Sequence, residues 1–248
     1  MLYEATLPKA CPHCGSSSGL GLQKIENKVI FQPASQVPRL TTGIAKMDTI
    51  LHFLSLNQKI AIVGPGSQKL IERLAVRAQL TNRYGGLDSH VIIVDGGNSS
   101  DPYLCVNFIR QYGLDTQNAL SKIISARAFT VYQLENLITH ELPNMVQKYD
   151  ARFVIISDLF AMFANDPYLD THDITRLLDS ISESILKLND CIVIVSISKL
   201  IKYWDAMIKS FNRIIVLSNK NDLTTIKIDH HDPFVMKMND MEIVSQEM

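Results

Sequence analysis

The feature that most constrains the fold is a series of short apolar runs that alternate with longer segments of helical periodicity. Most of these runs are continuous rather than alternately polar and apolar, which is typical of strands covered on both faces in a parallel sheet. We expect strands at 59–64, 90–96, 121–126, 152–157, 191–197 and 213–218, and helices at 70–81, 102–112, 131–149, 174–188 and 203–211.

This order of elements predicts a doubly wound α/β fold with a mostly parallel central sheet and right-handed crossovers. Asp101 followed by Pro102 is typical of a helix start, because Asp caps free N–H groups and Pro fits the first turn. Pro143 is expected to kink or end the third helix. The segments 224–228 and 234–238 alternate in polarity between turn residues, which predicts a closing antiparallel hairpin.

The gross composition limits the domain organisation. A length of 248 residues suits one large domain, and we expect an N-terminal extension (1–27), a linker (28–40) and a core (41–248). The 24 Lys+Arg against 25 Asp+Glu argue against a domain wholly wrapped in nucleic acid. No apolar run is long enough to span a membrane and no secretory signal is visible, so we expect a cytoplasmic protein without membrane partners.

A glycine-rich turn follows the first buried run, where nucleotide-binding α/β proteins hold phosphate. The order of strand, turn and helix is right, but the residues do not match G-x-x-x-x-G-K-[ST]. The motif needs a hydroxyl residue to hold Mg²⁺. That position falls on Ile71 in a direct alignment and on Leu70 if one residue has been deleted from the loop. Either the turn keeps a weak ATP site, in which backbone N–H groups receive an anion, or it binds nothing. The candidate residues are Gly64, Pro65, Gly66, Ser67, Gln68, Lys69 and Leu70.

The triplets TTG at 41–43 and ARA at 126–128 belong to two of five characteristic segments of the chain. In their order, these segments resemble the RadA-type recombinases and their paralogues in archaea and eukaryotes, and the resemblance extends from about Pro38 to the C-terminus. It implies a RecA-like phosphate-loop core, ATP as the cofactor, and a role in homologous recombination and DNA repair. The segments are 39–51, 91–114, 123–134, 153–163 and 225–243.

The resemblance also implies that the catalytic positions have changed. The family's water-orienting glutamate aligns with Gly97, which has no side chain to polarise water. The family's magnesium-associated aspartate aligns with Ser157, and Asp158 stands one residue later, where a strand residue points to the opposite face. Asp158 would reach an ATP site only if the strand has already ended. Because phosphoryl transfer depends on such positioned groups, we expect absent or weak hydrolysis and no catalytic residues.

Three functional hypotheses follow from these residues. The first is a recombinase paralogue that acts as an accessory factor through contacts with recombinases or other repair proteins, as a homo- or hetero-oligomer. The second is an ATP-binding switch whose nucleotide state controls assembly. The third is a zinc-dependent nucleic-acid-binding module, because Cys11 and Cys14 form a C-x-x-C pair, which is half of a four-ligand zinc site. A loop without metal is the alternative for that pair, and we expect Cys105 and Cys191 to be buried packing residues.

DNA binding is only weakly indicated. The segment 164–173, where the family has its first DNA-binding loop, contains three Asp and no Lys or Arg, and the second loop, at 197–201, is short. Basic residues at 199–213 surround Tyr203 and Trp204, and we favour a solvated helix face with inward aromatics over a DNA site. An F-x-x-A tetrapeptide at 31–34 resembles the family's subunit-linking motif, with an ordinary strand end as the alternative.

Overall fold

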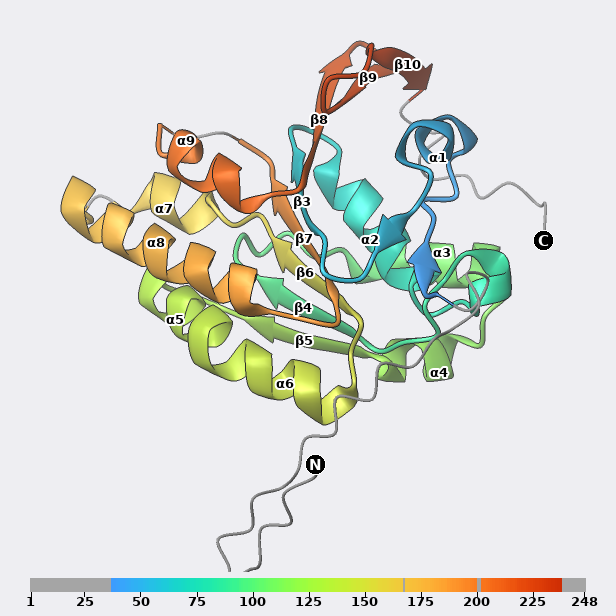
Figure 1. Ribbon diagram of the computed structural model, residues 1–248, viewed down its shortest axis with the longest axis horizontal. Helices are drawn as coiled ribbons and strands as arrows, with labels where there is room; N and C mark the ends of the chain where they lie inside the picture. Colours follow the sequence, from blue (N-terminus) through green and yellow to red (C-terminus); the bar gives the residue numbers. More distant parts are fainter. Residues whose placement is uncertain (1–36, 167, 200–201, 238–248) are drawn as a thin grey trace, which may run out of the picture. The chain divides into compact units, whose positions relative to one another are not determined.

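The computed structural model of the chain describes residues 37–166, 168–199 and 202–237. An eight-stranded sheet with the order β10-β9-β8-β3-β7-β6-β4-β5 forms its centre. The strands from β5 to β8 run parallel, and β8, β9 and β10 are antiparallel (Figure 1). The structure thus confirms the α/β fold and the closing hairpin. The strands are β3 (Lys59–Val63), β4 (Val91–Asp95), β5 (Ile123–Arg127), β6 (Phe153–Ser157), β7 (Ile192–Ile197), β8 (Arg213–Lys220), β9 (Leu223–Ile228) and β10 (Phe234–Lys237).

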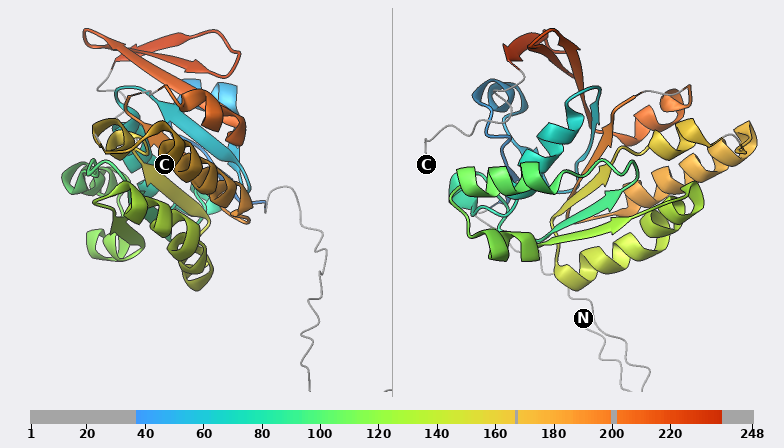
Figure 2. Two further views of the ribbon diagram at one scale, coloured as in Figure 1. Left: turned by 90° about the vertical axis from the view of Figure 1, so that its left-hand side faces the viewer. Right: turned by 180° about the vertical axis from the view of Figure 1, so that it is seen from behind.

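Helices cover both faces of this sheet (Figures 1 and 2). On one face lie α1 (Ala45–Leu51), α2 (Ser67–Arg77), α3 (Pro102–Gln111) and α4 (Thr116–Ser121). On the other lie α5 (Val131–Asn136), α6 (Leu142–Tyr149), α7 (Ala161–Asn165), α8 (Thr171–Lys187) and α9 (Trp204–Met207). A small separate pair of strands, β1 (Arg39–Leu40) and β2 (Leu54–Ser55), flanks α1. No helix in the described ranges has the length and apolar character needed to cross a bilayer.

Strand β3 explains why the apolar runs lack alternation. Successive side chains of a strand point to opposite faces of its sheet. Ile60 and Ile62 pack into the core formed with α1 and α2, whereas Ala61 and Val63 pack into the core formed with α5 and α8. Both faces are therefore buried, and every position of the strand must be apolar or internally paired.

Several helices differ from the sequence prediction, and the helix expected at 203–211 is divided into α9 and a 3-10 turn at Ile208–Ser210. Helix α2 begins at Ser67 rather than Leu70, so Gln68 and Lys69 belong to its first turn and not to the loop. The helix expected at 131–149 consists of α5, a π-helical turn at Leu137–Glu141, and α6. Pro143 lies in the first turn of α6. The wider π turn before it fits the missing N–H and the bulky ring of proline, so the helix continues without ending.

Asp101 caps α3 as predicted, because its carboxylate accepts the backbone N–H groups of Tyr103 and Leu104. The prediction of a loop at 164–173 is wrong at both ends of that segment. Its first two residues complete α7, and its last three are the start of α8. Asp170 accepts the N–H of Asp173 and caps α8, so one of the acidic side chains has a structural role.

Candidate functional site

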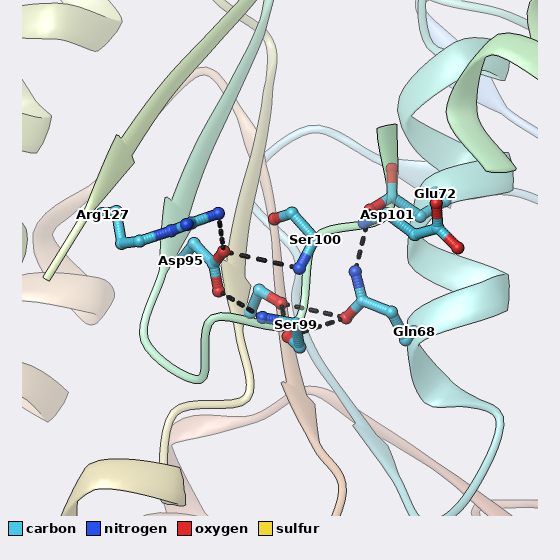
Figure 3. Close-up of polar contacts among 8 residues, drawn as sticks. Gln68, Glu72, Asp95, Ser99, Ser100, Asp101 and Arg127 are labelled. Atoms are coloured by element: carbon cyan, nitrogen blue, oxygen red, sulfur yellow. Dashed lines mark hydrogen bonds and ion pairs between the residues drawn. The ribbon is translucent and has the colours of Figure 1, made fainter. Parts of the chain in front are cut away.

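The candidate site lies where the carboxyl ends of the parallel strands meet the turn between β3 and α2. In open α/β sheets this edge is where ligands bind. Figure 3 shows the polar side chains that gather there, from α2, from the turn after β4, and from the end of β5.

The glycine turn is short and uses its own donors. Gly64 has φ +104°, and a side chain there would collide with the carbonyl oxygen of Leu217 in β8. The N–H of Gly64 donates to the carbonyl of Ile197 at 2.7 Å, and the N–H of Ser67 donates to the carbonyl of Gly64 at 3.2 Å. Pro65 has no N–H. Gly64, Pro65 and Ser67 therefore present no backbone N–H to a phosphate.

The side chain of Gln68 crosses from α2 to the ends of two strands. Its Oε1 accepts the hydroxyl of Ser99 at 3.1 Å and the hydroxyl of Ser157 at 3.0 Å. Its Nε2 donates to Glu72 Oε1 at 2.8 Å. The two serine oxygens lie 2.8 Å apart. Gln68 thus connects α2 with the turn after β4 and with the last residue of β6.

Asp95, at the end of β4, binds the backbone of the same turn. Its carboxylate accepts the N–H of Ser99 at 3.1 Å and that of Ser100 at 3.4 Å. Nη2 of Arg127, at the end of β5, lies 3.2 Å from the Asp95 carboxylate (Figure 3). Because Asp95 is only 2% exposed, this ion pair and the two N–H groups compensate for the burial of its charge.

Glu72, one turn after Gln68, is the other buried carboxyl of the site. Its Oε1 accepts the N–H of Asp101 at 3.1 Å in addition to the amide of Gln68. Burial raises the pKa of Glu72 to about 6, although these two hydrogen bonds oppose the rise. We call Gln68, Glu72, Asp95, Ser99, Asp101, Arg127 and Ser157 the Gln68 cluster.

Asp158 does not join the Gln68 cluster. Strand β6 ends at Ser157, and Asp158 takes the left-handed conformation with φ +47°. Its carboxylate accepts the N–H of Ser198 at 2.9 Å and the Ser198 hydroxyl at 2.8 Å. A Cβ on Gly97 would lie only 2.6 Å from the Cβ of Asp158. The missing side chain at Gly97 and the conformation of Asp158 are therefore sterically coupled.

The positions at which the motif binds magnesium hold residues of a different kind in this chain. Leu70 and Ile71, where the motif needs a hydroxyl, are buried in the core at 0% and 1% exposure. The hydroxyl of Ser157 is directed to Gln68, and Gly97 offers no side chain. An anion alone would meet the positive end of the helix dipole at the N-terminus of α2.

The other predicted candidates are cysteines, aromatic residues and the F-x-x-A tetrapeptide. Cys11, Cys14 and the tetrapeptide at 31–34 fall outside the described residues. Cys105 and Cys191 are buried packing residues, as predicted, and burial raises the pKa of Cys105 to about 12 and that of Cys191 to about 11. Trp204 stacks on Phe211 with ring centroids 5.9 Å apart, so this aromatic side chain packs inward as favoured.

Comparisons with known proteins agree with the geometry of the fold. The family model described as Rad51 matches residues 34–200. A similar curated protein is the meiotic recombination protein DMC1 homolog A of Oryza sativa subsp. japonica, which is 26% identical over 169 residues. That alignment covers 66% of this chain and 48% of the relative, so the chain spans about half the length of the relative it matches. The family match includes the glycine turn and every residue of the Gln68 cluster.

Proposed function

Because the chain belongs to the Rad51 family, we propose that it is an accessory factor of homologous recombination and DNA repair with absent or weak ATP hydrolysis. One observation carries this proposal: Gln68, Ser99 and Ser157 bond to one another at the sheet edge where a hydrolytic site needs free ligands. The relative named for meiotic recombination supports the cellular role.

The altered positions act together against hydrolysis. Phosphoryl transfer depends on a bound metal, a positioned water and compensating charge. Leu70 provides no metal-binding hydroxyl, Gly97 cannot orient water, and Ser157 carries no charge. Each loss removes a different contribution, so a single neighbouring residue does not replace them all.

An ATPase assay of the purified chain tests the proposal. We expect turnover at the background rate, with and without single-stranded DNA, while an intact Rad51-family ATPase in the same assay is active. Robust DNA-stimulated turnover by this chain would contradict the proposal.

Exposed features at β5 support the proposal of action through protein contacts. Strand β5 is at the edge of the sheet, where unpaired backbone groups can pair with a strand of another chain. Next to it, Phe129 is 77% exposed and Tyr132 is 52% exposed. Both line a cavity of about 480 Å³ with Arg127. We propose that this is the partner surface of the chain and that a Rad51-family recombinase binds here.

An ATP-binding switch is the second candidate, because the strand, glycine turn and helix occur in the order of a phosphate loop. In that case 64–70 would bind the phosphates, with Asp158 nearby. ATP at one hundred times its dissociation constant would then stabilise the fold by about 2.7 kcal/mol. A rise in the melting temperature with ATP that corresponds to this stabilisation would favour the switch over a nucleotide-independent factor.

The zinc module stays a prediction for Cys11 and Cys14. Metal analysis of the purified chain tests it, with a Cys11→Ser, Cys14→Ser double variant as control. Zinc in the natural chain that is lost in the variant, together with loss of nucleic-acid binding, is the expected result of that hypothesis. If neither the natural chain nor the double variant contains stoichiometric zinc, the zinc-module hypothesis is excluded.

A further inference from the structure

The Gln68 cluster connects four elements through contacts among its own side chains. Gln68 and Glu72 come from α2, Asp95 from the end of β4, Arg127 from the end of β5, and Ser157 from the end of β6. The turn 96–101 lies between them. It is held through both the side chain of Ser99 and the backbone N–H groups that Asp95 and Glu72 accept (Figure 3).

Burial makes these contacts strong and their loss costly. Glu72 is 4% exposed, Asp95 is 2% exposed and Ser157 is fully buried. A buried polar group that loses its partner bears the full cost of desolvation, so each member depends on the others. Gln68 is central because it alone joins α2 to the turn and to β6 through one side chain.

We propose that the Gln68 cluster takes the place of a bound nucleotide: it fixes the turn 96–101 against α2 and β6, so that the crevice keeps one conformation with or without ATP. A ligand can shift a conformational equilibrium only when it binds one state better than the other. A turn that is already fixed by internal contacts leaves little for a nucleotide to change. Gln68 is then a positioning residue, and the chain presents its partner surface constitutively. This goes beyond the proposed accessory role, because it concerns how the crevice keeps its shape.

Amide hydrogen exchange of Gln68→Ala tests the cluster. The amides of Ser99, Ser100 and Asp101 should exchange about tenfold faster than in the natural chain, since a tenfold change corresponds to the loss of about one net hydrogen bond. Amides of the central strand β7 should be unchanged. Gln147→Ala is the matched control, because Gln147 is an exposed helical glutamine on α6.

Two outcomes would overturn the inference. One is unchanged exchange of the turn in Gln68→Ala; the other is tenfold or stronger protection of the same amides in the natural chain by ATP with Mg²⁺. If Gln68→Ala does not fold, Ser157→Ala removes one of the two hydroxyls on Gln68 and should still accelerate exchange of the Ser99 amide. Unchanged exchange in a folded Ser157→Ala would then overturn it. The readout needs neither hydrolysis nor a partner, so failure of the accessory role would leave it interpretable.

Discussion

Glu72 is a buried carboxyl of the crevice whose pKa lies above its usual value. Its pKa rises from 4.5 to about 6, chiefly because burial disfavours the charged form. The charges of Asp101 and Asp95 raise the pKa further, while the N–H of Asp101 and the amide of Gln68 lower it. The folded chain therefore binds the Glu72 proton more tightly than the unfolded chain does.

This raised pKa predicts the sign of a pH effect on stability. The contribution of Glu72 is fully present below pH 4.5 and is lost as pH rises through about 6, by about 2 kcal/mol at most. Glu72→Gln cannot ionise and keeps an acceptor oxygen, so above about pH 6 it should be more stable than the natural chain. Urea unfolding across this range measures the difference, with the exposed Glu141→Gln as control. A Glu72→Gln variant that is less stable at every pH would refute the prediction.

The coupling between Gly97 and Asp158 gives a second prediction for single residues. Gly97→Ala places a Cβ 2.6 Å from the Cβ of Asp158, so the free energy of unfolding should fall by about 1–3 kcal/mol. Asp158→Gly removes that contact, and glycine suits the φ of +47°. In the Asp158→Gly background, Gly97→Ala should therefore be much less destabilising.

A double-mutant cycle by urea unfolding measures this coupling. If the changes in the free energy of unfolding caused by Gly97→Ala and Asp158→Gly simply add, the predicted coupling is contradicted. The same contact explains why Gly97→Glu alone is not expected to restore hydrolysis: the introduced side chain would displace Asp158 before it could orient water.

Among the elements, α8 depends on one cap for its start. Asp170 accepts the N–H of Asp173 at 2.8 Å at the beginning of this 17-residue helix. Asp170→Ala should lower the free energy of unfolding by about 1 kcal/mol, because a free N–H loses its partner. Asp179→Ala, an exposed substitution later in α8, is the matched control and should change stability less. Equal effects of the two substitutions would show that the cap is not the cause.

Strands β3, β4, β6 and β7 were predictable because burial on both faces leaves continuous apolar runs. Strand β5 begins at Ile123, two residues later than predicted, because Ser121 ends α4. The short helices were not predictable. Helix α4 buries only Ala119, so its periodicity is too weak to detect. The start of α2 was placed three residues late, because Gly66 in a left-handed conformation allows the helix to begin directly at Ser67.

The candidate site was predictable in its place but not in its contacts. The resemblance to RadA-type recombinases aligned Gly97 and Ser157, which follow or end β4 and β6, with catalytic positions of the same ATP site as the glycine turn. The contact between Gln68 and Ser157 joins residues 89 positions apart. It depends on the early start of α2, which gives Gln68 a helical direction toward the strands, and on the pairing of β6 with β4.

At the scale of the whole molecule, the two ends of the sheet differ. On one side the antiparallel strands β9 and β10 extend the sheet (Figure 2), with β10 as the last strand described. On the other side β5 ends a parallel sheet, and a second cavity of about 490 Å³ lies along it, lined by Ile123, Ser125 and Arg127. The β5 side thus combines an edge strand, exposed aromatic rings and cavities, which together favour it as the partner surface.

This asymmetry predicts that substitutions beside β5 weaken partner binding but leave the free energy of unfolding nearly unchanged. The double variant Phe129→Ala, Tyr132→Ala should weaken binding to a Rad51-family recombinase of the same organism, or self-association, by at least about tenfold, because exposed aromatic residues are frequent binding anchors. Its unfolding should change little, since both rings are largely exposed. Titration calorimetry with the recombinase and sedimentation of the chain alone distinguish the two partners. Leu223→Ala on β9, at the opposite end, is the control and should leave both associations intact. If the double variant binds as tightly as the natural chain while Leu223→Ala does not, the partner surface lies on the hairpin and not on β5.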